Sequence, residues 1–246
     1  MYNIEKFTKT IPSQENTMIF LYLSIIFGAM HWVFVWQENR TGILITKPAM
    51  MISLILWEIV YGKAFLLAQC PASRRMIWFL IGIILCTVGD IFLMFREKHF
   101  IKGLGAFLLG HVFYVIGFGT LIPVGATPLF AIGVALLVVA ASTIIFTKLR
   151  AGMIANGKTK MILPVAAYTI IISLMLYSAV MTHPVRRSRY TLFLSVGALL
   201  FYISDVMNAW VQFVAPLKRH RFKIMTTYYI AELFIAIGAT MHFLSR

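Results

Sequence analysis

The sequence is poor in the residues that stabilise most secreted domains and in the polar residues that cover soluble ones. Its two cysteines, Cys70 and Cys86, lie far apart and lack the spacing of metal ligands, which argues against a disulfide framework or a zinc site. Only 12% of the residues are charged, whereas 61% are hydrophobic. A soluble domain of 246 residues cannot bury that much apolar surface, so most of the chain is expected to lie in lipid.

Negative charge is also scarce. Eight Asp and Glu residues stand against 22 Lys and Arg residues, and the resulting net charge of +14 collects between the apolar segments. Basic linkers of this kind are typical of loops that meet anionic lipid headgroups. No basic domain stands apart from the apolar segments, so we expect no nucleic-acid partner. The sequence also lacks a P-loop, a GxSxG elbow and an HExxH motif, which leaves those chemistries without support.

Long apolar runs are what the sequence does contain. Each has about 17–24 residues, the length that crosses a hydrocarbon core of roughly 30 Å as a helix. The fold class is therefore expected to be all-α, a polytopic membrane bundle of eight transmembrane helices, because lipid offers no partner to an open sheet edge. The predicted helices are Met18–Trp36, Ile45–Tyr61, Met76–Phe95, Gly103–Ile122, Thr127–Phe146, Met161–Met181, Thr191–Val214 and Ile224–Leu244.

The linkers between these runs are short and basic, and none could hold a separate domain. We predict an N-terminal segment, residues 1–17, followed by a single transmembrane domain, residues 18–246. The first apolar run is too long for a signal-peptide core and is interpreted as a retained helix. If both termini face outward, the inner linkers carry about a dozen Lys and Arg residues, against about nine for the opposite topology, so the margin is small.

An internal similarity divides the transmembrane domain. Gly82 and Asp90 match Gly197 and Asp205 at an offset of 115 residues. The match predicts a four-plus-four repeat, and an even number of helices in each half makes the two halves parallel. The halves would cover residues of about 18–122 and 127–246.

The two matched aspartates, Asp90 and Asp205, are the only aspartates in the chain, and both lie inside apolar runs. An aspartate in a spanning helix costs about 2.5–3.5 kcal/mol on insertion scales. Each could make a polar contact between helices. Alternatively, one pocket could collect both, and two carboxyl groups in a low-dielectric pocket would take different protonation states.

The fourth predicted helix carries further candidates. His111 and Tyr114 lie three residues apart and share a face. Gly103, Gly110 and Gly117 recur every seven residues, a small-residue stripe that allows a neighbouring helix to approach closely. Tyr114 lies near this stripe and is therefore expected to point into the bundle. For His111, a hydrogen bond between helices is an equally good interpretation.

Other polar side chains could act on the aspartates or on a substrate. Asn208 follows Asp205 by three residues and could orient it, and Tyr228 and Tyr229 could both reach the side of Glu232 that follows them. Packing between helices is the alternative for each. Lys47 could bind a phosphate, balance an aspartate or extend to the headgroups.

Two further expectations concern the second predicted helix. Glu58 lies near its far end and is expected at the membrane interface. Pro48, like Pro164 later in the chain, is expected near a helix start, where proline is tolerated. This placement would distinguish the chain from carriers that break their helices in mid-membrane.

Five blocks of sequence together resemble the YhhN-like, or lysoplasmalogenase, family. The blocks are TKP from Thr46, TVGDIFL from Thr87, GLGAFLLGHVFY from Gly103, GALLFYISD from Gly197 and MTTYYIAELF from Met225. The resemblance implies an eight-helix membrane protein that hydrolyses the vinyl ether bond of lysoplasmalogens to a fatty aldehyde and glycerophosphocholine or glycerophosphoethanolamine. It also implies that Glu232 stands where many relatives have glutamine.

Vinyl ether hydrolysis needs an acid that protonates the alkene and an anion that stabilises the oxocarbenium ion and takes a proton from water. Glycosidases meet a related demand with two carboxyl groups. We expect Asp90 and Asp205 to form this catalytic pair, with the two roles left open. The residues expected to bind substrate or orient the pair are Lys47, His111, Tyr114, Asn208, Tyr228, Tyr229 and Glu232.

The expected partners are a lysophospholipid substrate and the bilayer, with no metal or organic cofactor. The expected location is a bacterial cytoplasmic membrane or a eukaryotic endomembrane, as an integral multi-pass protein. The alternative function is a proton-coupled transporter of a small solute or lipid, because duplicated halves and acids within the membrane are features of carriers as well.

Overall fold

The structure, a computed structural model, describes residues 14–67, 71–121, 128–182 and 188–244. All regular elements within these ranges are helical, and eight of the helices are long and apolar enough to cross a membrane. The predicted fold class is thereby confirmed: the protein is an integral, multi-pass membrane protein with an all-α bundle. Most of the N-terminal segment, residues 1–13, lies outside the described residues.

The helices follow one another with short connections. The elements are α2 (Gln14–Trp36), α3 (Arg40–Leu67), α4 (Pro71–Met94), α5 (Arg96–Gly119), α6 (Pro128–Ala155), the short 3₁₀ helix η1 (Thr159–Met161), α7 (Ile162–Met181), α9 (Arg189–Phe213) and α10 (His220–Leu244).

Several helices extend beyond the apolar runs into the basic segments that sequence reasoning assigned to linkers. α5 begins at Arg96 rather than Gly103, with non-helical angles at His99, and α3 begins at Arg40 rather than Ile45. Long basic side chains can carry their charge to the headgroups while their stems follow the helix, so a basic residue does not end it. The placement of Pro48 at a helix start is therefore wrong, because Pro48 lies inside α3.

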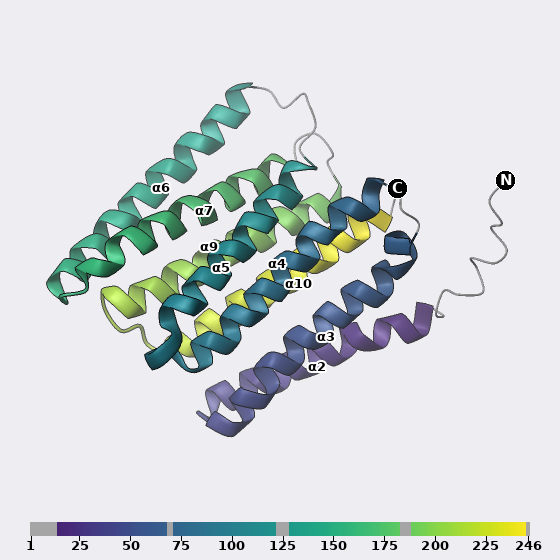
Figure 1. The fold of residues 1–246 in the computed structure, drawn as a ribbon, viewed down its shortest axis with the longest axis horizontal. Coiled ribbons are helices and arrows are strands. Elements are labelled where there is room, and N and C mark those ends of the chain that lie inside the picture. The colour runs from purple at the N-terminus through teal and green to yellow at the C-terminus, as the bar shows by residue number, and fades with distance from the viewer. Residues whose placement is uncertain (1–13, 68–70, 122–127, 183–187, 245–246) are drawn as a thin grey trace.

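The helices lie alongside one another, with α4, α5, α9 and α10 in the middle of the bundle (Figure 1). α2 and α3 cover one flank, and α6 and α7 cover the other. α10 packs against α2, α3, α4 and α9. In the most apolar 18-residue stretch of each helix, 56% of the residues of α10 are buried, against 11% for α6. α10 is therefore the central helix, whereas α6 presents most of its surface to lipid.

The glycine stripe of α5 permits the close approach that the sequence predicted, and the helix that approaches it is α4. A Cβ atom added at Gly110 would lie 2.8 Å from the Cys86 sulfur and 3.1 Å from the Gly82 carbonyl oxygen. One added at Gly103 would lie 3.3 Å from the carbonyl oxygen of Gly89. The two helices thus approach backbone to backbone, which fixes the position of α4 and of the aspartate near its end.

The predicted four-plus-four repeat stays a prediction. Tyr114 and Tyr229, which the repeat makes equivalent, are both buried. Their hydroxyl groups have different partners: Tyr114 donates to Glu232, and Tyr229 shares a hydrogen bond with Ser24.

Candidate active site

A cavity of about 910 Å³ enters the bundle from one end. Its walls come from α3, α4, α5, α6, α7, α9 and α10, with Glu38 and Val35 contributing from the end of α2 and the turn after it. The exposed residues of its lining lie at the turns α2–α3 and α4–α5 and at the start of α10. We call these residues the mouth: Glu38, Arg40, Phe95, Lys98 and Arg221.

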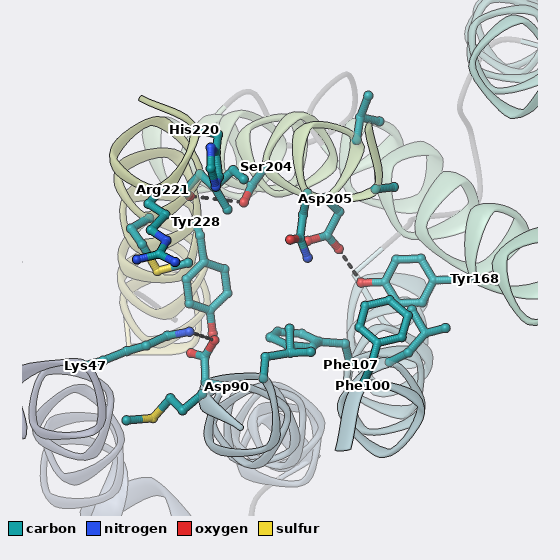
Figure 2. A pocket seen from close by; sticks show the side chains of 18 of the residues that line it. Lys47, Asp90, Phe100, Phe107, Tyr168, Ser204, Asp205, His220, Arg221 and Tyr228 are labelled. Carbon is teal, nitrogen blue, oxygen red and sulfur yellow. Dashed lines mark hydrogen bonds and ion pairs between the residues drawn. The ribbon is translucent and has the colours of Figure 1, made fainter. Parts of the chain in front are cut away.

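One wall of the cavity holds a buried ion pair. The Lys47 ammonium on α3 lies 2.7 Å from a carboxylate oxygen of Asp90 on α4, and both side chains are less than a tenth exposed. Among the alternatives for Lys47, the structure thus selects the one in which it balances an aspartate. The ring of Tyr228, on α10, extends toward Asp90 (Figure 2).

The opposite wall holds the second aspartate. Tyr168 on α7 donates a hydrogen bond to the Asp205 carboxylate on α9 (Figure 2). The Nε2 atom of His111 on α5 lies 3.8 Å from the same carboxylate oxygen. His111 is fully buried behind this wall and does not line the cavity. Side chains from two other helices, α5 and α7, therefore lie beside this carboxyl group.

The two aspartates lie on facing walls of the same cavity (Figure 2). Of the other candidates, Lys47, Asn208 and Tyr228 also line it. The geometry therefore brings five of the nine sequence-predicted residues to one space.

The remaining candidates besides His111 lie deeper in the bundle. Tyr114 donates a 2.6 Å hydrogen bond to Glu232, and neither residue lines the cavity. The Tyr229 hydroxyl lies 2.9 Å from the Ser24 hydroxyl, which donates to the Met50 carbonyl oxygen. The expected contact of Tyr228 and Tyr229 with Glu232 is not among the hydrogen bonds of the described residues: Tyr229 pairs with Ser24 on α2, and the Tyr228 ring extends toward Asp90 on α4 (Figure 2).

Glu58 is also misplaced by sequence reasoning. It is 1% exposed, and its carboxyl oxygens have no hydrogen-bond partner among the described residues. α3 continues to Leu67, so Glu58 lies well before the end of the helix, and α10 packs against this helix. The apolar run was shorter than the helix, which made Glu58 look terminal.

Another wall of the cavity is apolar. It is formed by residues of α5, α6 and α7, namely Leu104, Phe107, Ile145, Leu149, Val165 and Ile172. Such a surface can accommodate a hydrocarbon chain beside the two carboxyl groups. The cavity thus combines two facing polar walls that carry the aspartates, an apolar wall and a charged mouth.

Tyr168 is the site residue that sequence reasoning missed. The rest of its helix has the apolar sequence of an ordinary transmembrane helix. Its partner, Asp205, is 37 residues away. A hydroxyl in mid-helix was the only available signal. No local spacing connects it to an aspartate on the next spanning helix.

The site is suited to proton transfer. It contains two carboxyl groups, one beside a cation and one beside a phenol, in a space walled by apolar side chains. Across the described ranges, no cluster of three or more His, Cys, Asp or Glu side chains could hold a metal ion.

Comparison with known proteins gives the family. A model described as the YhhN family matches residues 42–239. Human lysoplasmalogenase TMEM86A is 28% identical over 94% of this chain and 88% of its own length. Mouse lysoplasmalogenase TMEM86B is 30% identical over 85% of this chain and 79% of its own. A lysoplasmalogenase of Mycobacterium bovis is 28% identical over 82% of this chain and 73% of its own. No solved structure matches the chain.

Proposed function

The chain belongs to the YhhN family, and on that premise we propose that it hydrolyses the vinyl ether bond of lysoplasmalogens, which are single-chain alkenyl glycerophospholipids. Its relatives named lysoplasmalogenase, from mammals and mycobacteria, support this substrate class. The observation that carries the proposal is the pair of aspartates on facing walls of one cavity. The products would be a fatty aldehyde and glycerophosphocholine or glycerophosphoethanolamine.

The reaction consumes one water molecule and needs no oxidant. A carboxylic acid transfers its proton to the β-carbon of the vinyl ether, and the alkene electron pair forms the new C–H bond. The α-carbon becomes an oxocarbenium ion, which the oxygen of water attacks while the second carboxylate takes a proton from that water. The resulting hemiacetal then breaks its bond to the glycerol oxygen, which gains a proton as the aldehyde forms.

The partners of the two carboxyl groups support a division of roles. The Lys47 ammonium, 2.7 Å away, compensates a negative charge on Asp90. Asp90 is therefore assigned as the anion that stabilises the oxocarbenium ion. Asp205 contacts a phenol and a buried imidazole rather than a lysine, so it is assigned as the acid that protonates the alkene.

The apolar wall supports the orientation of the substrate. The hydrocarbon chain would lie along Leu104, Phe107 and Ile172, and the glycerophospho group would point to the mouth. The vinyl ether, which joins the two parts, would then lie between the aspartates. Exclusion of bulk water by the chain would strengthen the electrostatic interactions around the reacting carbon atoms.

The test measures aldehyde release from lysoplasmalogen by the purified protein and by its Asp90→Asn and Asp205→Asn variants. Removal of a general acid or of the stabilising anion should lower kcat by about 10²–10⁴-fold in each variant. In D₂O, the protein should place one deuterium on the carbon next to the aldehyde. Thermal unfolding in detergent controls for loss of fold.

Wild-type rates in both folded variants would remove the two aspartates from the mechanism. Absence of turnover by the wild-type protein, together with proton-linked solute uptake into vesicles, would support a carrier instead. The two outcomes are separate, because the first concerns the residues and the second concerns the reaction.

A further inference from the structure

The mouth of the cavity carries charge that the proposed reaction does not use. We propose that Arg40 and Arg221 bind the phosphate of a single-chain phospholipid and that Glu38 binds the ammonium group of its head. This headgroup subsite rests on the proposed function for the lipid class, and it moves the phosphate away from Lys47, where sequence reasoning had placed it.

Lys47 is a poor phosphate ligand in this fold. Its ammonium is buried and already paired with Asp90 at 2.7 Å. A phosphate that took this cation would leave a buried carboxylate without compensation, which is strongly unfavourable. The substrate phosphate therefore needs other cations.

The two arginines are positioned to supply that charge. Arg40 precedes Lys47 by seven residues on α3, and Arg221 precedes Tyr228 by seven residues on α10. Seven residues are two helical turns, or about 10.5 Å, so each arginine lies above its partner on the same helix face. All four residues line the cavity. The arginines thus form a charged layer two turns closer to the mouth than the aspartate layer.

The spacing of the two layers fits the chemistry of the ligand. In a glycerophospholipid with one alkenyl chain, the glycerol carbons separate the phosphate from the vinyl ether. A phosphate at the arginine layer would thus allow the vinyl ether to reach the layer of Asp90 and Asp205. Guanidinium groups suit this task because their planar donors can bind two phosphate oxygens at once.

The arginines are available for such a ligand. The ion pair between a basic and an acidic side chain that is found within the described residues joins Lys47 to Asp90, and it includes no mouth residue. Both arginines are exposed. Lys98, from α5, adds a third cation to the same mouth.

Glu38 makes the subsite zwitterionic. Apart from the two aspartates, it is the only carboxylate among the described residues that line the cavity. Its backbone has a left-handed φ of 56°, in a turn closed by a 2.9 Å hydrogen bond from the Asn39 amide to the Phe34 carbonyl oxygen. The same turn leads directly into Arg40, so the two charged residues are two positions apart in the chain at the mouth.

The experiment measures binding of a saturated 1-O-alkyl lysophosphatidylethanolamine, which lacks the vinyl ether and cannot be hydrolysed by this reaction. Arg40→Gln and Arg221→Gln should each weaken its binding about tenfold, the loss expected for one charge-assisted contact. Lys223→Gln is the matched control, because Lys223 is exposed on the same helix but does not line the cavity. It should bind the analogue as the wild type does.

Two further ligands identify the parts of the head. Glu38→Gln should weaken binding of the ethanolamine lipid severalfold and leave binding of 1-O-alkyl glycerophosphate, which has no ammonium group, unchanged. Inorganic phosphate should compete with either lipid only weakly, because it lacks the chain. Equal competition by inorganic phosphate would overturn the lipid subsite in favour of a free-anion site.

The binding experiment tests the headgroup subsite separately from the proposed hydrolysis. Arginine-dependent binding without aldehyde release would retain the subsite and reject the proposed hydrolysis. Aldehyde release with unchanged binding and KM in both arginine variants would retain the hydrolysis and overturn the subsite. No binding of the ether lipid to the wild-type protein would also overturn it.

Discussion

At the residue scale, Tyr168 links the carboxyl group of Asp205 to the neighbouring helices. Its hydroxyl donates to the carboxylate, and its ring packs edge-on against His111 with centroids 5.4 Å apart. Asp205 thus accepts a hydrogen bond from a phenol whose ring is itself packed against a third helix. In the proposed mechanism Asp205 delivers its proton to one carbon atom, and small displacements of a catalytic group reduce rates strongly.

Replacement of Tyr168 tests this positioning role. Tyr168→Phe should lower kcat for vinyl ether hydrolysis by about 10–100-fold, with a smaller change in KM, because Asp205 loses its orienting donor. Tyr177→Phe on the same helix is the control, since Tyr177 lines a separate groove between α6 and α7 and should retain wild-type turnover. Equal kinetics for the two variants would contradict the role of Tyr168.

Glu232 shows what a local pattern can and cannot predict at this scale. The sequence identified it as a costly carboxyl group in an apolar helix, and it is indeed fully buried. Its predicted partners were the tyrosines one turn before it. Its actual partner is Tyr114, which is 118 residues away on α5. Periodicity assigns a residue to a helix face, but the helix that faces it is chosen by tertiary packing.

At the element scale, the α4–α5 pair positions Asp90 through close backbone contact. Gly110 and Gly82 permit this approach because neither has a side chain to hold the helices apart. The Lys47–Asp90 ion pair depends on the position of α4 relative to α3. Packing between two glycine-bearing helices therefore determines the geometry of a site residue two turns away.

Substitution of Gly110 tests the close approach. Gly110→Ala should destabilise the folded protein by about 1–3 kcal/mol, because its Cβ atom would press on the Cys86 sulfur and the Gly82 carbonyl oxygen. Gly105→Ala should be neutral or slightly stabilising, since nothing lies within 4 Å of its added Cβ atom and alanine favours a helix. Thermal unfolding in detergent gives both values. Equal melting temperatures would show that α4 and α5 can separate without cost.

At the scale of the whole molecule, basic residues gather at the end where the cavity opens. Exposed residues there include Arg40, Lys98, Lys158, Arg219 and Arg221. The positive-inside rule places the more basic end in the cytoplasm. The small excess of Lys and Arg residues in the linkers at this end thus predicts that the mouth opens to the cytoplasmic leaflet. A single-chain lipid could enter the cavity from that leaflet.

Cysteine labelling of intact cells tests this orientation. In a Cys70→Ser background, Lys158→Cys at the mouth end should react with a membrane-impermeant maleimide only after permeabilisation. Arg189→Cys, at the start of α9 and the other end of the bundle, should react without it. The remaining native cysteine, Cys86, is buried and should stay unlabelled. The reverse pattern would place the mouth outside.

The sequence by itself determined that most of the protein lies in lipid and that it has eight spanning helices. It also identified the acidic residues whose insertion into lipid is unfavourable in free energy. These properties follow from local hydrophobicity and from the rarity of buried acids, so they can be predicted without knowing which helices pack against one another. It could not fix the helix ends, because basic side chains continue helices that hydropathy ends.

Only the tertiary structure decided which candidates share a space. It paired Lys47 with Asp90, joined Tyr168 to Asp205, and placed Tyr114, Tyr229 and Glu232 behind the cavity wall. The reason is physical. A hydrogen bond or an ion pair depends on a few ångströms between atoms on different helices, and those distances are set by packing rather than by spacing along the chain.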